Sequence, residues 1–148
     1  MILNEYETTY VARPDLPEDA MLRLGEKVGA AIQGQAGTVL VTEDWGKRKL
    51  AYNIAKHQRG HYVYLNYVGP AAIVGEIERA LRLEDDLLRF LTVKIADDVE
   101  PESRRALAEE RRRLRIERMA ALKAEEEAEA RYRAEAEEDG DDAGEIDD

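Results

Sequence analysis

The chain has 148 residues, 44% hydrophobic and 37% charged, which is enough for one packed domain plus a segment that faces solvent almost entirely. It contains no cysteine, which excludes disulfides, thiolate chemistry and cysteine-based metal sites. We expect neither a secretory signal nor a membrane span, because the first ten residues lack a basic region and no apolar run is long enough.

The net charge of −11 is concentrated at one end of the chain. Residues 125–148 contain thirteen acidic and two basic residues, and therefore carry −11 by themselves. Residues 101–124, with eight basic and four acidic residues, carry +4. The acidic total therefore does not argue against an anionic partner for the first hundred residues.

The first elements follow from periodicity and helix-start signals. Residues 2–12 alternate with period two and predict a strand, which the Arg13-Pro14 step ends. A helix is expected to begin after an N-cap at Asp15, with Glu18 as its capping-box partner, and to run to about Gln35. The strand should place Tyr6, Thr8, Tyr10 and Ala12 on one face, and Glu5, Glu7, Thr9 and Val11 on the other.

The middle of the chain predicts two strands that form a hairpin. Residues 38–42 are β-branched, Gly46 is read as a bulge, and the strand resumes to Ile54. Residues 57–60 are expected to form the turn, and residues 62–68 the returning strand.

A second helix should open at Gly69-Pro70 and stop near Arg82, before a last strand over residues 87–96. The resulting order, strand-helix-strand-strand-helix-strand, predicts an α+β domain with the ferredoxin-like βαββαβ arrangement. Its four-stranded antiparallel sheet should carry both helices on one face. The other face must then meet solvent or a partner.

The sequence divides into three parts. Residues 1–98 are expected to form the ferredoxin-like domain, which is followed by Glu100-Pro101. Residues 99–138 are mostly Ala, Glu and Arg and predict a charged helical extension, with leucines too sparse for a coiled coil. Residues 139–148 have almost nothing to bury and predict a disordered acidic tail.

The basic hairpin, residues 45–68, is the strongest functional feature. No acidic residue occurs from Gly46 to Gly75, although the chain as a whole is acidic. Such a local contrast favours binding of phosphates, although lysines on an edge strand also prevent aggregation. The candidate RNA-binding residues of the hairpin are Lys47, Arg48, Lys49, Lys56 and Arg59.

Other candidate sites have weaker support from the sequence. His57 and His61 lie at a turn without nearby ligands to complete a metal site, so we expect none. Tyr62 and Tyr64 share the face without helices, where we expect them to contact a protein partner. The sequence shows no catalytic motif, phosphate loop or cofactor signature, so we expect no catalytic residue and no cofactor.

Residues 46–56, GKRKLAYNIAK, followed by Gly60 and an aromatic strand, resemble the sixth small-subunit ribosomal protein family of bacteria. The similarity spans about residues 4–96 in the same element order. It implies a structural, non-enzymatic component of the cytoplasmic ribosome, which binds the central domain of small-subunit ribosomal RNA together with the eighteenth small-subunit protein. The matching RNA-contact positions are Arg48, Lys49, Lys56, Arg82 and Arg89.

Two departures from the family pattern are visible, and two alternatives stay open. Asn53 stands where many relatives have proline, and Glu84 stands at an often basic position, which should weaken RNA attraction near Arg82. One alternative is a free-standing RNA-binding or regulatory module of the same fold. The other is an acylphosphatase-like enzyme with Arg13 as its anion-binding residue.

Overall fold

The computed structural model describes residues 1–142. Its first compact unit is Met1–Glu109, and the rest of the last helix belongs to a second unit. The elements in chain order are β1 (Asn4–Ala12), α1 (Glu18–Gly34), β2 (Thr38–Ile54), β3 (His57–Gly69), α2 (Ala72–Arg82), β4 (Leu87–Ala96) and α3 (Pro101–Asp142).

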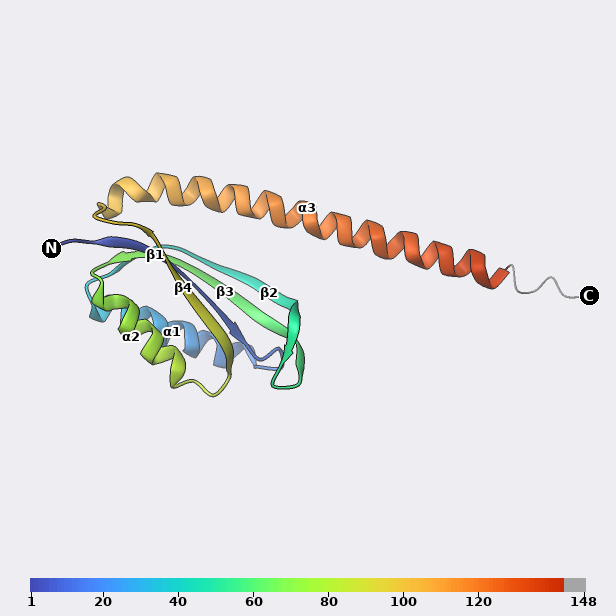
Figure 1. Ribbon diagram of the computed structural model, residues 1–148, viewed down its shortest axis with the longest axis horizontal. Coiled ribbons are helices and arrows are strands. Elements are labelled where there is room, and N and C mark those ends of the chain that lie inside the picture. The colour runs from blue at the N-terminus through green and yellow to red at the C-terminus, as the bar shows by residue number, and fades with distance from the viewer. Residues whose placement is uncertain (143–148) are drawn as a thin grey trace, which may run out of the picture. The chain divides into compact units, whose positions relative to one another are not determined.

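The four strands form one sheet in the order β2-β3-β1-β4, and all neighbouring strands pair antiparallel. Helices α1 and α2 cover the same face of this sheet (Figure 1). The predicted ferredoxin-like fold is therefore confirmed. We call the face beneath α1 and α2 the inner face, and the opposite face, to which Glu5 and Tyr64 point, the outer face.

The main core lies on the inner face. The predicted alternation of β1 is correct, because Tyr6, Tyr10 and Ala12 belong to this core. They pack against the apolar stripes of α1 and α2, which bury Val28, Ile32, Ile77 and other aliphatic side chains. Burial of this apolar surface supplies the main driving force for folding.

One polar group inside this core is shared by three strands. Thr8 Oγ1 lies 2.7 Å from the hydroxyl of Tyr67 and 2.8 Å from Oγ1 of Thr92. These hydrogen bonds satisfy hydroxyls that would otherwise be buried at a cost. Burial nevertheless raises the pKa of Tyr67, because it disfavours the phenolate.

The hairpin differs from the prediction at its turn. Gly46 is a bulge as predicted, with φ of 74° and a register shift beside it. The turn, however, is formed by Ala55 and Lys56, both with positive φ, and His57 already belongs to β3. Two-residue hairpin turns need positive φ to match the twist of the strands, and this geometry outweighed the composition of residues 57–60.

The start of α1 also differs. The helix begins at Glu18 after Pro17, without a side-chain cap, so Asp15 is not its N-cap. Leu16 instead donates its backbone N–H to the carbonyl of Arg13 at 3.3 Å, which forms a turn before the helix. The proline therefore marks the helix start, as its fixed φ favours.

The extension departs from the predicted division of the chain. Helix α3 continues to Asp142, so residues 139–142 are helical, and residues 143–148 lie outside the described part. The first nine residues of α3, Pro101–Glu109, belong to the compact unit of the sheet, so that unit ends at Glu109 and not at residue 98. The outer face is thus not wholly open, contrary to expectation.

Candidate nucleic-acid interface

The pairing of β2 with β3 determines how the cations of the basic hairpin are arranged. Lys49 lies opposite Arg59, and Lys47 lies opposite His61. Because side chains alternate along a strand, these four residues share one face, while Arg48, opposite Gly60, points to the other. Like charges in directly opposed positions destabilise a sheet, and a bound anion would relieve that cost.

Arg48 is part of an aromatic stack on the outer face. Trp45 lies parallel to Tyr64, with ring centroids 5.2 Å apart and an interplanar angle of 8°. The guanidinium carbon of Arg48 is 5.8 Å from the Trp45 ring centroid, and Arg48 Nε donates to the Trp45 carbonyl at 3.2 Å. Glu43 accepts a hydrogen bond of 2.9 Å from Nε1 of Trp45 and fixes the indole.

Two predicted RNA contacts lie away from the hairpin. Arg89 is on β4, at the sheet edge opposite to β2, and pairs with Val11 of β1. Arg82 ends α2, where its guanidinium lies 5.8 Å from the Phe90 ring centroid and 4.0 Å from the carboxylate of Glu78. The predicted cations therefore form a hairpin group that includes Lys56 in the turn, and two further residues near β4, Arg82 and Arg89, which no contact joins among the described residues.

Two acidic residues near these cations have partners of their own. Glu84 binds Nζ of Lys27 at 2.5 Å, so the charge expected to disturb Arg82 is compensated from α1. Asp86 binds the guanidinium of Arg13 at 2.5 Å. That ion pair places a carboxylate where the enzyme alternative needs an open anion-binding arginine.

The two tyrosines assigned to a protein partner differ in exposure. Tyr62 is half-buried, but Tyr64 is only 3% exposed, because Trp45 and Ala108 of α3 pack beside it. Tyr64, which we expected to contact a protein partner on this face, is therefore covered by residues of its own chain. Four further residues complete this face, and the sequence gives no local signal that brings them together: Trp45, Glu5, Arg104 and Ala108.

A cavity of about 650 Å³ opens on the inner side of the sheet, between α1 and the distal part of β2 and β3. His61 lies in it and contacts Oδ1 of Asp44 at 2.6 Å. Burial and the charge of Asp44 raise the pKa of Tyr10, which also lines the cavity, to about 12. The neutral phenol of Tyr10 is thus strongly favoured in the folded domain.

Among the described residues, no group of three histidine, aspartate or glutamate side chains is arranged to hold a metal ion. Within residues 1–142, no helix is both long and apolar enough to span a bilayer.

Comparison with known proteins gives concordant results. The profile of the family described as ribosomal protein S6 matches residues 5–94. Small ribosomal subunit protein bS6 of Trichlorobacter lovleyi is 44% identical, over 66% of this chain and 80% of its own. The bS6 protein of Syntrophobacter fumaroxidans is 38% identical, over 70% of this chain and 71% of its own. The crystal structure of 30S ribosomal protein S6 from Thermotoga maritima shares the fold, with a TM-score of 0.60, 24% identity and coverage of 76% and 98%.

Proposed function

Because the chain belongs to the ribosomal protein S6 family, and is thus a protein of the small ribosomal subunit, we propose that it binds the central domain of small-subunit ribosomal RNA together with the eighteenth small-subunit protein. The observation that carries the RNA part is the opposed pair Lys49 and Arg59 within a hairpin free of acidic compensation after Asp44. An RNA phosphate supplies the missing anion.

Membership of this family also decides whether the chain is an enzyme and where in the cell it acts. Its members are structural ribosomal proteins and not enzymes, so the acylphosphatase-like alternative is wrong. As a small-subunit protein, the chain is a component of the cytoplasmic ribosome.

We assign the RNA contacts in two groups. The hairpin group acts mainly through phosphates, because its cations are long, exposed or half-exposed, and attached to a rigid pair of strands. The edge pair, Arg82 and Arg89, would meet a second segment of RNA. The proposed hairpin contacts are Lys47, Arg48, Lys49, Lys56 and Arg59.

We place the protein partner on the outer face, next to Tyr62. This residue lies in one row across the sheet with Gly46, Val11 and Arg89, since each is paired with the next strand. Tyr64, two residues further along β3 on the same face, packs beneath Ala108. A partner can therefore contact Tyr64 only if this part of α3 is displaced.

The proposal is tested by titrating the purified chain against a central-domain ribosomal RNA fragment, with and without the eighteenth small-subunit protein. We expect tight binding only when both are present. Each phosphate neutralised should steepen the dependence of log affinity on log salt by about 0.7–0.9. Equal binding without the partner protein supports a free-standing RNA-binding module, which would also fail to be recovered stoichiometrically with ribosomal particles. No binding in either case refutes the proposal.

A further inference from the structure

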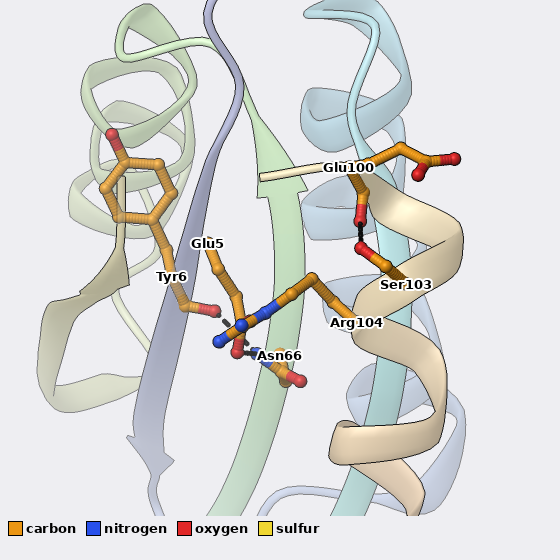
Figure 2. Close-up of polar contacts among 6 residues, drawn as sticks. All are labelled: Glu5, Tyr6, Asn66, Glu100, Ser103 and Arg104. Carbon is orange, nitrogen blue, oxygen red and sulfur yellow. Dashed lines mark hydrogen bonds and ion pairs between the residues drawn. The ribbon is translucent and has the colours of Figure 1, made fainter. Parts of the chain in front are cut away.

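The first turns of α3, Pro101–Glu109, lie over the outer face of the sheet, and we call this segment the cover. Figure 2 shows its polar anchor: Arg104 Nε is 2.5 Å from Oε1 of Glu5, a β1 residue with 0% exposure. The amide of Asn66 donates to the other oxygen of Glu5 at 3.0 Å and to the carbonyl of Tyr6 at 3.1 Å. A carboxylate buried this deeply needs a cationic partner, and Arg104 is that partner.

An apolar contact lies one helical turn beyond Arg104. Ala108, at the i+4 position and so on the same face of the helix, is 2% exposed and packs with Val41 and Tyr64. Trp45, stacked on Tyr64, borders the same cluster. The cover therefore packs against the aromatic stack at Tyr64.

The chain that leads into the cover is itself attached to β1. Val99 donates its N–H to the carbonyl of Leu3 at 2.8 Å, and the N–H of Asp98 donates to the side-chain oxygen of Asn4 at 3.0 Å. These bonds hold residues 98–99 in place independently of Arg104. The attachment point would therefore stay in place if the segment that follows were displaced.

The cover contacts the sheet through few side chains. Its one strongly buried apolar residue is an alanine, and its leucine, Leu107, is 41% exposed. Loss of Arg104 without a replacement would leave the buried carboxylate of Glu5 uncompensated, which is strongly destabilising, whereas the apolar contacts of the cover are few. A partner that replaces both contacts can displace the cover without unfolding the domain.

We propose that Pro101–Glu109 is a removable intrachain cover that competes with a basic protein partner for the outer face. The partner's chemistry follows from the surface itself, because β1 presents Glu5 and Glu7 there and β2 presents Glu43. It must supply a cation in place of Arg104 and a small apolar group in place of Ala108. The proposed competition depends on the partner surface proposed above. The existence of the cover does not depend on that proposal.

Single cysteines test the cover, since the chain has no thiol of its own. In the full chain, Ala108→Cys should react with Ellman's reagent at least about 10-fold more slowly than exposed Ala106→Cys. Adding Arg104→Ala should raise the rate at position 108 by about 10-fold or more, because Glu5 then loses its cation. Adding Arg104→Lys should raise it less.

The matched control is Arg105→Ala, which removes the neighbouring arginine that pairs with exposed Glu102 and should leave the rate unchanged. A cysteine at the core position Val28 should stay protected in every variant, which shows that the domain remains folded. Equal thiol reaction rates at positions 106 and 108, or an unchanged rate at position 108 in Arg104→Ala, would show that Pro101–Glu109 does not cover the sheet as proposed.

The competition has a separate readout, the affinity for the eighteenth small-subunit protein measured on the full chain. Arg104→Ala should bind it several-fold more tightly than the unchanged chain, and Arg105→Ala should bind it equally well. Equal affinity for Arg104→Ala and the unchanged chain overturns the competition. If no variant binds, the proposed partner is wrong, while the thiol rates still decide whether the cover exists.

Discussion

Lys49 and Arg59 lie directly opposite each other on β2 and β3, so that two cations face one another across the hairpin. Both are exposed, and the next pair on the same face of the ladder is Lys47 opposite His61. Such an arrangement lowers the stability of the free domain and raises its attraction for phosphates. Stability and RNA affinity should therefore respond to its removal in opposite directions.

Lys49→Ala should raise the free energy of unfolding by a few tenths of a kcal/mol, roughly the size of a like-charge cross-strand pair, and lower RNA affinity. Urea unfolding and RNA titration at two salt concentrations measure the two effects. Arg23→Ala on α1 is the control, because it removes an exposed cation paired with Asp19 outside the hairpin and should leave RNA binding unchanged. A loss of stability in Lys49→Ala would contradict the opposed-charge argument.

Tyr64→Asp should lower the free energy of unfolding by about 3 kcal/mol or more, because it removes a buried aromatic ring and buries a carboxylate. The Trp45 fluorescence should change with it, since the two rings are stacked. Tyr62→Asp, at a half-buried site, should cost much less. A thermal midpoint unchanged by Tyr64→Asp would show that the ring is not packed as described.

Tyr10 should make the domain sensitive to alkali. Its folded pKa of about 12 exceeds the ordinary value of 10.0, so the folded state retains the proton longer than the unfolded state. Stability is therefore fully present below pH 10 and is lost as pH rises towards 12, by about 2–3 kcal/mol in all. Chemical unfolding at pH 8 and pH 11 should show a smaller loss in Tyr10→Phe than in exposed Tyr52→Phe. Equal losses would contradict the assignment.

Two glycines should respond in opposite ways to a single methyl group. A Cβ at Gly60 would collide with the side chain of Val11, so Gly60→Ala should destabilise the domain by about 1–3 kcal/mol. Gly29 lies inside α1 with open space around it, so Gly29→Ala should stabilise by about 0.5–1 kcal/mol. Thermal unfolding of both variants is the measurement, and a stable Gly60→Ala protein would mean that β1 and β3 are less closely packed.

The sequence by itself determined the type and order of the six domain elements, the bulge at Gly46 and the boundaries of β4. It also identified the family, through residues 46–56. These features are local, because side-chain periodicity of two or 3.6 residues and the backbone preferences of glycine act within a few positions. The RNA-contact assignments, some of which lie outside this motif, stay predictions.

Only the tertiary structure decided which residues meet. The pairing of β2 with β3, which shifts register between Lys49 and Ile54, opposes Lys49 to Arg59, and a one-residue change of register would have moved them apart. Arg104 reaches Glu5 across 99 positions of sequence, from a helix whose other arginines look the same in the sequence. Local preferences cannot select one arginine of several; the buried carboxylate of Glu5 does so, because only a cation at that position compensates its loss of water.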